Sequence, residues 1–234
     1  MKTIVVLQPG YLPWLGFFDQ MRRADVFVYY DDVQFDKNSW RNRNRIRALN
    51  GPHWLSVPVL HQGLGKPLIK DIRIDNRVPW ARKHIGTLKQ FYREAVYIDR
   101  YIEPIEKILN RQWIYLVDLN VELAAQMAEW LKIKTQVVFA SKLGIEGERS
   151  ERLLAICKHF QAQKYLSGDS AREYLDVGLF SKNGIKVEWQ DYQHPAYRQL
   201  HGEFLPYLSA LDLLLNMGDE SAFILKGVDV KAIR

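Results

Sequence analysis

Four arginines alternate with other residues along one short segment of the chain. They are Arg41, Arg43, Arg45 and Arg47. Side chains two residues apart share a face of a β-strand, so this spacing predicts an arginine-lined face with Asn42 and Asn44 on the opposite face. A planar guanidinium binds phosphate oxygens through two parallel hydrogen bonds. The segment therefore predicts a site for a compact anion such as a diphosphate, with a solvated edge strand protected by its charges as the alternative. We take Asn42, Arg43, Asn44 and Arg45 as candidate substrate-binding residues.

The net charge of the chain is concentrated in this segment. The 234 residues include 33 Lys and Arg against 27 Asp and Glu, a formal net charge of +6, and 47% of the residues are hydrophobic. Residues 36–47 hold five basic residues and one aspartate, a local net charge of +4. A chain this hydrophobic with so small a net charge is not intrinsically disordered. The concentration of charge favours one anionic ligand over a basic coat for nucleic acid.

A turn rich in proline and aromatic residues follows the first apolar run, residues 3–7. Its candidate site residues are Gln8, Pro9, Tyr11 and Trp14. Rings in such a turn can stack on a nucleobase or a sugar, and the helix that follows begins with free N–H groups that bind anions. Packing beneath a sheet is the alternative role for these rings. The turn has neither the G-x-G-x-x-G nor the P-loop pattern, so the standard nucleotide fingerprints are absent.

Two adjacent acids and a glutamine follow the second apolar run, residues 26–30. They are Asp31, Asp32 and Gln34. Acids at a strand end can bind a ribose, hold a metal ion together with substrate phosphates, or accept a proton. Adjacent side chains of an extended segment point in opposite directions, so we expect only one of the two acids to act. An ion pair with a nearby arginine is the alternative role.

The candidate base in the second half of the chain is His194. It precedes Pro195 in a restrained loop that also contains Tyr197 and Gln199. A neutral imidazole can accept a proton near neutral pH, and a structural hydrogen bond is the alternative role for His194. Ser167 ends a short apolar run and is a candidate substrate-binding residue, without the G-x-S-x-G frame of a nucleophilic serine.

The histidines and the single cysteine give no metal site. The histidines show no ligand spacing, and one cysteine, Cys157, can form neither a disulfide framework nor a zinc site built on cysteine pairs. No metal is therefore predicted.

The periodicity of the chain predicts elements that bring these candidates to the ends of strands. Strands over residues 3–7 and 26–30 flank a helix from residue 15 to residue 24, which is a βαβ unit with parallel strands. The arginine strand and residues 54–59 form a hairpin, and residues 80–131 are helical. Further elements are expected as strands over residues 68–74, 137–140, 165–168 and 185–189, and helices over 151–160 and 208–216. The predicted class is α/β, a mainly parallel sheet that starts with a Rossmann-like βαβ unit, with an arginine-rich β-hairpin and a helical middle region.

No linker divides the sequence. We therefore predict a single domain over residues 3–218 and a C-terminal tail over residues 219–234. No apolar run approaches the roughly 20 residues of a membrane-spanning helix, which predicts a cytoplasmic protein without membrane insertion. The oligomeric state is left open.

Eight segments together resemble one known family. They are residues 8–18 (QPGYLPWLGFF), 24–28 (ADVFV), 31–35 (DDVQF), 42–46 (NRNRI), 54–58 (WLSVP), 165–168 (YLSG), 194–197 (HPAY) and 208–218 (LSALDLLLNMG). The chain resembles the WbqC-like family from about Thr3 to Gly218. The resemblance implies a bacterial protein of O-antigen, other surface-polysaccharide or specialised biosynthetic clusters, with glycyl or other aminoacyl transfer to an amino sugar as the suggested activity. It supplies no catalytic residues.

The implied chemistry can be assigned to the candidate residues. Acyl or aminoacyl transfer to a nucleotide-linked amino sugar needs a diphosphate clamp, a base for the amine, and donors for the oxyanion of the tetrahedral intermediate. The arginine strand supplies the clamp, Asp32 or His194 the base, and Gln8, Gln34 or Asn42 the oxyanion donor. Asp32, His194 and Gln8 are thus the candidate catalytic residues. The activated donor, an aminoacyl-tRNA, an acyl thioester or an adenylate, is not specified, and no other cofactor is predicted.

Two other functions remain open. One is an ATP-dependent adenylating or nucleotidyl-transfer enzyme at the first βαβ unit, whose H-x-G-H signature is absent from the turn. The other is a non-catalytic protein that binds a nucleotide sugar or RNA, and RNA binding would be strongly salt-dependent.

Overall fold

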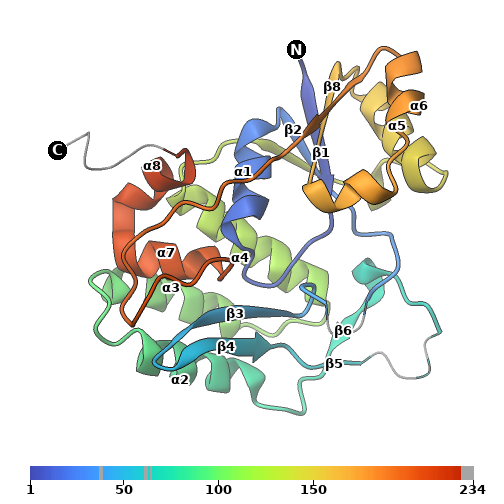
Figure 1. The fold of residues 1–234 in the computed structure, drawn as a ribbon. Helices are drawn as coiled ribbons and strands as arrows, with labels where there is room; N and C mark the ends of the chain where they lie inside the picture. Colours follow the sequence, from blue (N-terminus) through green and yellow to red (C-terminus); the bar gives the residue numbers. More distant parts are fainter. Residues whose placement is uncertain (37–38, 61–62, 64, 228–234) are drawn as a thin grey trace. The chain divides into compact units, whose positions relative to one another are not determined.

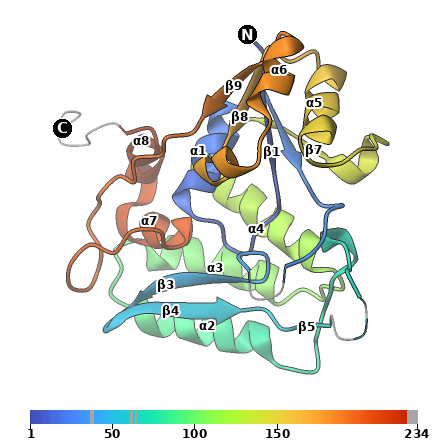
Figure 2. The ribbon, with the colours of Figure 1, turned by 45° about the vertical axis from the view of Figure 1, so that its right-hand side comes forward.

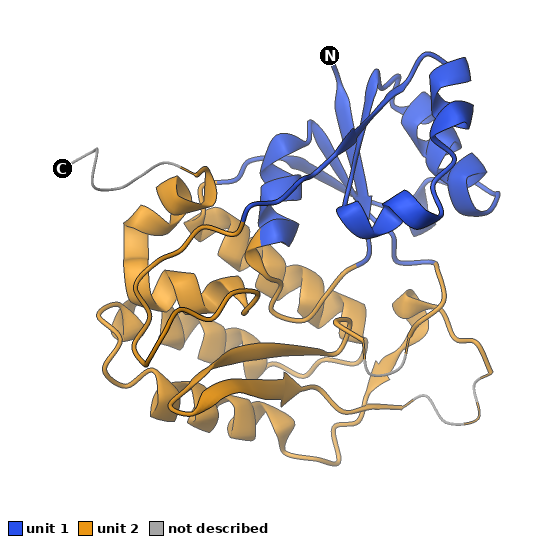
Figure 3. Ribbon diagram, viewed as in Figure 1, with its two compact units in different colours: residues 1–8, 16–32, 133–193 blue, residues 9–15, 33–132, 194–234 orange. Residues whose placement is uncertain are grey.

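The computed structural model describes residues 1–36, 39–60, 63 and 65–227, and it confirms the α/β class (Figure 1). The chain forms two compact units (Figure 3). Unit 1 contains residues 1–8, 16–32 and 133–193, and unit 2 contains residues 9–15, 33–132 and 194–234. Each unit is built from several chain segments. The single domain over residues 3–218 stays a prediction.

Unit 1 is built on a five-stranded parallel sheet with the strand order β7-β2-β1-β8-β9 (Figure 2). Its strands are β1 (Thr3–Leu7), β2 (Val26–Tyr29), β7 (Gln136–Phe139), β8 (Lys164–Ser167) and β9 (Lys186–Trp189). β1 and β2 pair in parallel, and α1 (Leu15–Arg23) connects them, which confirms the predicted βαβ unit. The other helices of the unit are α5 (Arg149–His159) and α6 (Val177–Lys182), with 3₁₀ turns η2 (Ala140–Lys142) and η3 (Asp169–Glu173). Apolar side chains of β1, β2 and α5, such as Ile4, Val28 and Ile156, are fully buried between these layers.

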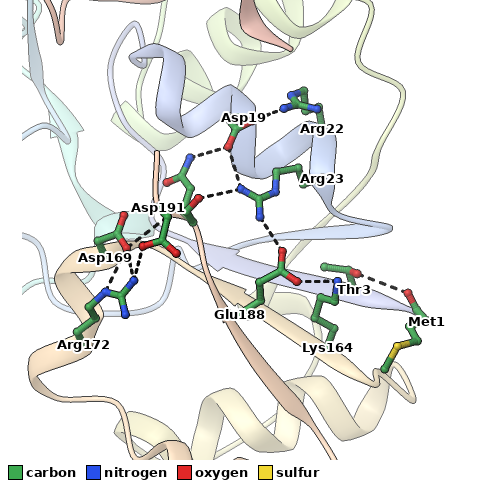
Figure 4. Close-up of polar contacts among 11 residues, drawn as sticks. Met1, Thr3, Asp19, Arg22, Arg23, Lys164, Asp169, Arg172, Glu188 and Asp191 are labelled. Carbon is green, nitrogen blue, oxygen red and sulfur yellow. Dashed lines mark hydrogen bonds and ion pairs between the residues drawn. The ribbon is translucent and has the colours of Figure 1, made fainter. Parts of the chain in front are cut away.

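Ion pairs join α1 to the strands β8 and β9 (Figure 4). The Arg23 guanidinium contacts Asp19 at 3.3 Å and Glu188 at 2.6 Å, and Glu188 also pairs with Lys164 at 2.7 Å. Arg172 lies between Asp169 and Asp191. Acidic partners therefore neutralise the basic side chains of this cluster.

Unit 2 combines the arginine hairpin with five α-helices in the described part of the chain. Its elements are β3 (Arg43–Ala48), β4 (Gly51–Ser56), β5 (Val59–Leu60), β6 (Arg73–Ile74), α2 (Trp80–Phe91), α3 (Ile98–Leu109), α4 (Leu116–Trp130), α7 (Ala210–Met217) and α8 (Ser221–Leu225), with 3₁₀ turns η1 (Ile69–Asp71) and η4 (Gly218–Glu220). β3 and β4 pair antiparallel, which confirms the hairpin. The apolar stripe of α4 is buried, as Leu116, Leu119 and Leu123 show. No helix among the described residues is both long enough and apolar enough to cross a bilayer.

Three element boundaries differ from the sequence expectation. Most of the strand expected over residues 68–74 is the turn η1, because Ile69 and Ile72 are both fully buried at a spacing of three residues, which suits a helical turn. The returning strand β4 spans Gly51–Ser56 instead of residues 54–59, since the hairpin turns earlier, at Leu49 and Asn50. Residues 219–225 of the expected tail form η4 and α8, whose Ile224 and Leu225 are buried, and residues 228–234 lie outside the described residues.

Candidate functional site

Arg43 and Arg45 lie on tryptophan rings. In the hairpin register Arg43 pairs with Ser56 and Arg45 with Trp54, so these side chains share one face. The Cζ atom of Arg43 lies 4.4 Å from the centroid of the Trp54 ring, and that of Arg45 lies 5.4 Å from Trp40 and 5.7 Å from Trp54. A planar guanidinium that stacks on an indole keeps its outer N–H groups available to a ligand.

Neither of these two arginines has a carboxylate partner among the described residues. The guanidinium of Arg45 donates from Nη2 to the carbonyl oxygen of Tyr207 at 3.2 Å, and that acceptor is neutral. Arg47 differs: it is buried and donates from Nε to the His201 carbonyl at 2.9 Å and from Nη2 to the Glu203 carbonyl. Arg41 lies in the turn before β3 begins. The prediction of four arginines on one ligand-binding face is therefore wrong in detail, and Arg43 and Arg45 are the pair available for an anion.

Aromatic rings extend this face toward His194. Trp40, Trp54 and Tyr207 are 45%, 42% and 50% exposed. Trp40 lies 5.3 Å from Trp54 between ring centroids, and Tyr207 lies 5.6 Å from Trp14 and 5.3 Å from His194. We call the set Trp40, Arg43, Arg45, Trp54 and Tyr207 the Arg–Trp surface. Its three aromatic members are not among the site residues predicted from the sequence. The hairpin register, which places Trp54 opposite Arg45, is the signal that could have found Trp54.

His194 is a neutral imidazole beside this surface. Burial lowers the pKa of His194, and a hydrogen bond to the Pro195 carbonyl opposes that shift. The carbonyl can only accept, so Nδ1, at 2.9 Å, is the protonated nitrogen and Nε2 has the lone pair. His194 can therefore accept a proton through Nε2 near neutral pH.

Asn44 holds the turn of residues 9–14 against the hairpin. Its Nδ2 donates to the carbonyls of Tyr11 at 3.1 Å and Leu12 at 2.8 Å, and its Oδ1 accepts from the Arg45 N–H at 2.8 Å. Leu12 is fully buried with φ of 43°, a left-handed conformation that costs free energy in a leucine. Asn44 thus stabilises a strained turn and the backbone of Arg45 together.

An Asn44→Ala variant is expected to lose about 1–3 kcal/mol of stability, because it leaves buried backbone groups without hydrogen-bond partners. Denaturant unfolding measures this loss. Gln126→Ala, on α4, is the control; its half-buried side chain bonds only to Glu129 among the described hydrogen bonds, and the change should alter stability by less than about 0.5 kcal/mol. An Asn44→Ala protein as stable as the control would show that the turn does not depend on this side chain.

Tyr11 lies inside unit 2. Its ring is fully buried, and its hydroxyl is 2.8 Å from Nδ1 of His84. Trp14 in the same turn is partly buried and contacts Tyr207. Of these two rings, Trp14 is thus the one beside the Arg–Trp surface.

The two adjacent acids of unit 1 have different partners. Asp31 is buried and accepts from the N–H of Ser141 at 3.0 Å and from its hydroxyl at 2.6 Å. Asp32 pairs with Arg152 at 2.5 Å, and Arg152 also lies over the Tyr30 ring. The side chains diverge as expected for neighbours at a strand end. Asp32 as a base stays a prediction. Ser141 and Arg152 lie about 110 and 120 residues further along the chain, too far for a local pattern to indicate these contacts.

The predicted site residues are divided between the two units. Unit 1 holds Gln8, Asp31, Asp32 and Ser167; unit 2 holds Pro9, Tyr11, Trp14, Gln34, Asn42, Arg43, Asn44, Arg45, His194, Tyr197 and Gln199. Gln8 and Ser167 lie at the carboxyl ends of β1 and β8. Gln34 forms a bridge with Leu68. Asn42 donates from Nδ2 to the Val57 carbonyl at 2.9 Å. Of these residues, Arg43 and Arg45 belong to the Arg–Trp surface. Trp14 and His194 lie beside it, against the ring of Tyr207.

Tyr197 and Gln199 bind a buried carboxylate. The side chain of Asp212 on α7 accepts from the hydroxyls of Tyr92 at 2.6 Å and Tyr197 at 2.7 Å, and from Nε2 of Gln199 at 3.0 Å. Burial raises the pKa of Asp212, and these hydrogen bonds oppose the shift. The Tyr92 hydroxyl in turn accepts from the N–H of Arg47 at 2.9 Å. The network ties the loop that carries His194 to α7 and to the arginine strand.

Metal-ligating groups do not cluster in the described residues. No set of three or more His, Cys, Asp or Glu side chains there could hold an ion. Burial raises the pKa of Cys157 to about 12, so the cysteine remains a thiol.

Comparison with known proteins gives a family. The WbqC-like protein family matches residues 8–223. A relative from Mycobacterium tuberculosis (strain ATCC 25618 / H37Rv), described as uncharacterized protein Rv1507c, is 36% identical over 223 residues, which cover 94% of this chain and 96% of the relative. No solved structure matches the chain.

Proposed function

Since the chain belongs to the WbqC-like protein family, we propose that it is a transferase that moves an acyl or aminoacyl group to the amine of a nucleotide-linked amino sugar, in surface-polysaccharide or specialised biosynthesis. Unit 2 binds the acceptor through its diphosphate. The observation that carries this proposal is the pair Arg43 and Arg45, which stack on exposed tryptophans and lack carboxylate partners among the described residues.

The geometry suits an anion with two phosphates. Arg43 and Arg45 are two residues apart on one strand face, so their guanidinium groups can contact neighbouring phosphate groups of one ligand. Trp40, Trp54 and Tyr207 supply open aromatic faces beside them. A ligand that is anionic at one end and cyclic at the other therefore fits the Arg–Trp surface.

His194 serves as the base in the proposed reaction. The acceptor amine attacks the carbonyl carbon of the activated acyl donor, and Nε2 of His194 takes the proton that the nitrogen loses as the C–N bond forms. The tetrahedral intermediate then collapses, the bond to the leaving group breaks, and the leaving group departs with the electron pair and receives the proton from His194. The lowered pKa of His194 keeps it unprotonated before the reaction.

Replacing the two arginines tests the clamp. Arg43→Ala and Arg45→Ala are each expected to weaken binding of inorganic pyrophosphate and UDP about tenfold or more, and the double variant about 100-fold, since charge-assisted hydrogen bonds contribute about 1.5–3 kcal/mol. Titration calorimetry measures both affinities. The control Arg93→Ala removes an exposed arginine that pairs with Glu94 and should leave binding unchanged.

The rate of acyl transfer tests the role of His194 as the base. His194→Gln should bind UDP normally but lose transfer from whichever donor proves active among an aminoacyl-tRNA, an acyl thioester and an acyl adenylate. Unchanged pyrophosphate binding in the double arginine variant would contradict the clamp, and full turnover of His194→Gln would contradict the base. Steeply salt-dependent binding of generic RNA that pyrophosphate does not displace would instead favour an RNA-binding protein.

A further inference from the structure

A cavity of about 490 Å³ lies between β4 and α2 in unit 2. Figures 1 and 2 both show α2 running alongside β4. Small-molecule sites usually occupy about 300–1,000 Å³ and combine aromatic walls with a few polar groups. This cavity has that size and, as its lining shows, that composition.

The lining combines two indoles with hydrogen-bonding side chains. Trp54 and Trp80 supply aromatic surface, and Ser56, Lys83 and Thr87 supply polar groups. Lys83 is the only Lys, Arg, Asp or Glu among the residues that line it. The composition suits an uncharged ring system with polar edges, because rings stack on indole faces and polar edges bond to hydroxyl and ammonium groups.

One wall of the cavity is held rigidly. His84 is 6% exposed, and its Nδ1 bonds to the Tyr11 hydroxyl. Burial lowers the pKa of His84 to about 4, so the ring is neutral at physiological pH. The Trp80 ring packs edge-on against His84, and its Nε1 donates to Asn76. This wall of the site is therefore preformed. The neutral His84 ring adds no second positive charge beside Lys83.

Trp54 belongs both to this cavity and to the Arg–Trp surface. Its ring lies 4.4 Å from the guanidinium carbon of Arg43, and the residue before Arg43, Asn42, lines the cavity. Trp54 is therefore a wall shared by the cavity and the Arg–Trp surface.

We infer that the cavity between β4 and α2 binds the nucleoside of a nucleoside diphosphate ligand, with the base stacked on Trp54. The inference rests on the proposed function, because it requires the phosphates on Arg43 and Arg45. A planar base matches an indole wall better than a puckered sugar does, and base stacking on an aromatic side chain contributes about 1–3 kcal/mol.

The test fills the cavity and leaves the arginines intact. Wild-type protein should bind UDP, dTDP, CDP, ADP or GDP at least about tenfold more tightly than inorganic pyrophosphate, as stacking of this strength requires. Thr87→Trp should remove that advantage and leave pyrophosphate affinity unchanged. Lys83→Trp fills the cavity from an exposed position should Thr87→Trp fail to fold. The matched control Lys89→Trp also replaces an exposed lysine of α2, one that pairs with Glu106 and does not line this cavity, and it should change neither affinity.

The outcomes separate the inference from the proposed function. A wild-type protein that binds every nucleoside diphosphate only as tightly as pyrophosphate overturns the inference and leaves the arginine clamp in place. The inference is also overturned, with the clamp still in place, if both cavity-filling variants bind nucleoside diphosphates more tightly than pyrophosphate. If these variants instead remove an advantage of glucosamine 1-phosphate over inorganic phosphate and spare UDP, the sugar occupies the cavity and the inference is wrong. Absent pyrophosphate binding contradicts the clamp itself.

Discussion

An Asp212→Ala variant is expected to lose about 3–5 kcal/mol of unfolding free energy, because it removes the shared acceptor of a buried hydrogen-bond network. Asp212 is fully buried, and two tyrosine hydroxyls and one glutamine amide donate to it. The truncation removes the carboxylate to which all three groups donate, although Nε2 of Gln199 also donates to the Leu205 carbonyl at 3.0 Å. Each buried group that loses its acceptor costs about 1–3 kcal/mol. A loss of this size is a large share of the stability of an ordinary domain.

The loss should depend on pH in a defined direction. Burial raises the pKa of Asp212 in the folded protein above its usual 3.8. A raised pKa means that the folded state holds the proton more tightly than the unfolded state does. The resulting contribution to the free energy of unfolding is complete below pH 3.8, and it declines as the pH rises through the folded-state pKa. The difference between wild type and Asp212→Ala should therefore be largest in acid and smaller at neutral pH.

Urea unfolding at several pH values measures both effects. Asp212→Asn is the matched control, because its amide oxygen still accepts one hydrogen bond and the side-chain volume is kept; we expect a loss of about 1–2 kcal/mol. Equal losses for the alanine and asparagine variants would contradict the role assigned to the carboxylate.

His84 is expected to make the protein sensitive to acid. Burial lowers the pKa of His84 from 6.5 to about 4, and His53 adds a smaller effect in the same direction. The unfolded chain therefore binds a proton between these two pH values that the folded protein does not, so stability falls as the pH drops from about 6.5 to about 4. A difference of this size corresponds to about 3 kcal/mol.

A variant without the titrating ring isolates this contribution. His84→Asn keeps an acceptor for the Tyr11 hydroxyl and cannot be protonated in this range. The stability of the wild type relative to His84→Asn should fall by about 3 kcal/mol between pH 6.5 and pH 4. A difference that stays constant across this range would contradict the assignment, whatever its size.

Local patterns were sufficient to predict much of the fold. The apolar runs of β1 and β2, separated by the helical spacing of α1, predicted a parallel βαβ unit, and the register of Ile4 with Val26 confirms it. The strand expected over residues 68–74 was wrong because a short apolar run fits a helical turn as well as a strand. Sequence periodicity gave no sign that the chain divides into two units, since this depends on contacts between distant segments.

The candidate site was predicted only where strand geometry was enough. Alternation placed Arg43 and Arg45 on one face, but nothing local distinguished them from Arg47, whose acceptor His201 lies 154 residues away. Tyr197 and Gln199 are predicted to bind ligand, and their hydrogen bonds to Asp212 depend on where α7 lies in the fold, which no local pattern indicates. Long-range partners decided which polar residues are structural.

The division of the chain into interleaved units has a consequence for synthesis. Unit 2 includes residues 9–15 and the segment after residue 193, so it cannot be completed until that segment has been synthesised. The hairpin with Arg43 and Arg45 leaves the ribosome first, and Tyr207, whose carbonyl accepts from Arg45, follows 162 residues later. Until then a nascent chain carries the cationic hairpin without its later partners, so the Arg–Trp surface is assembled only after this segment has emerged.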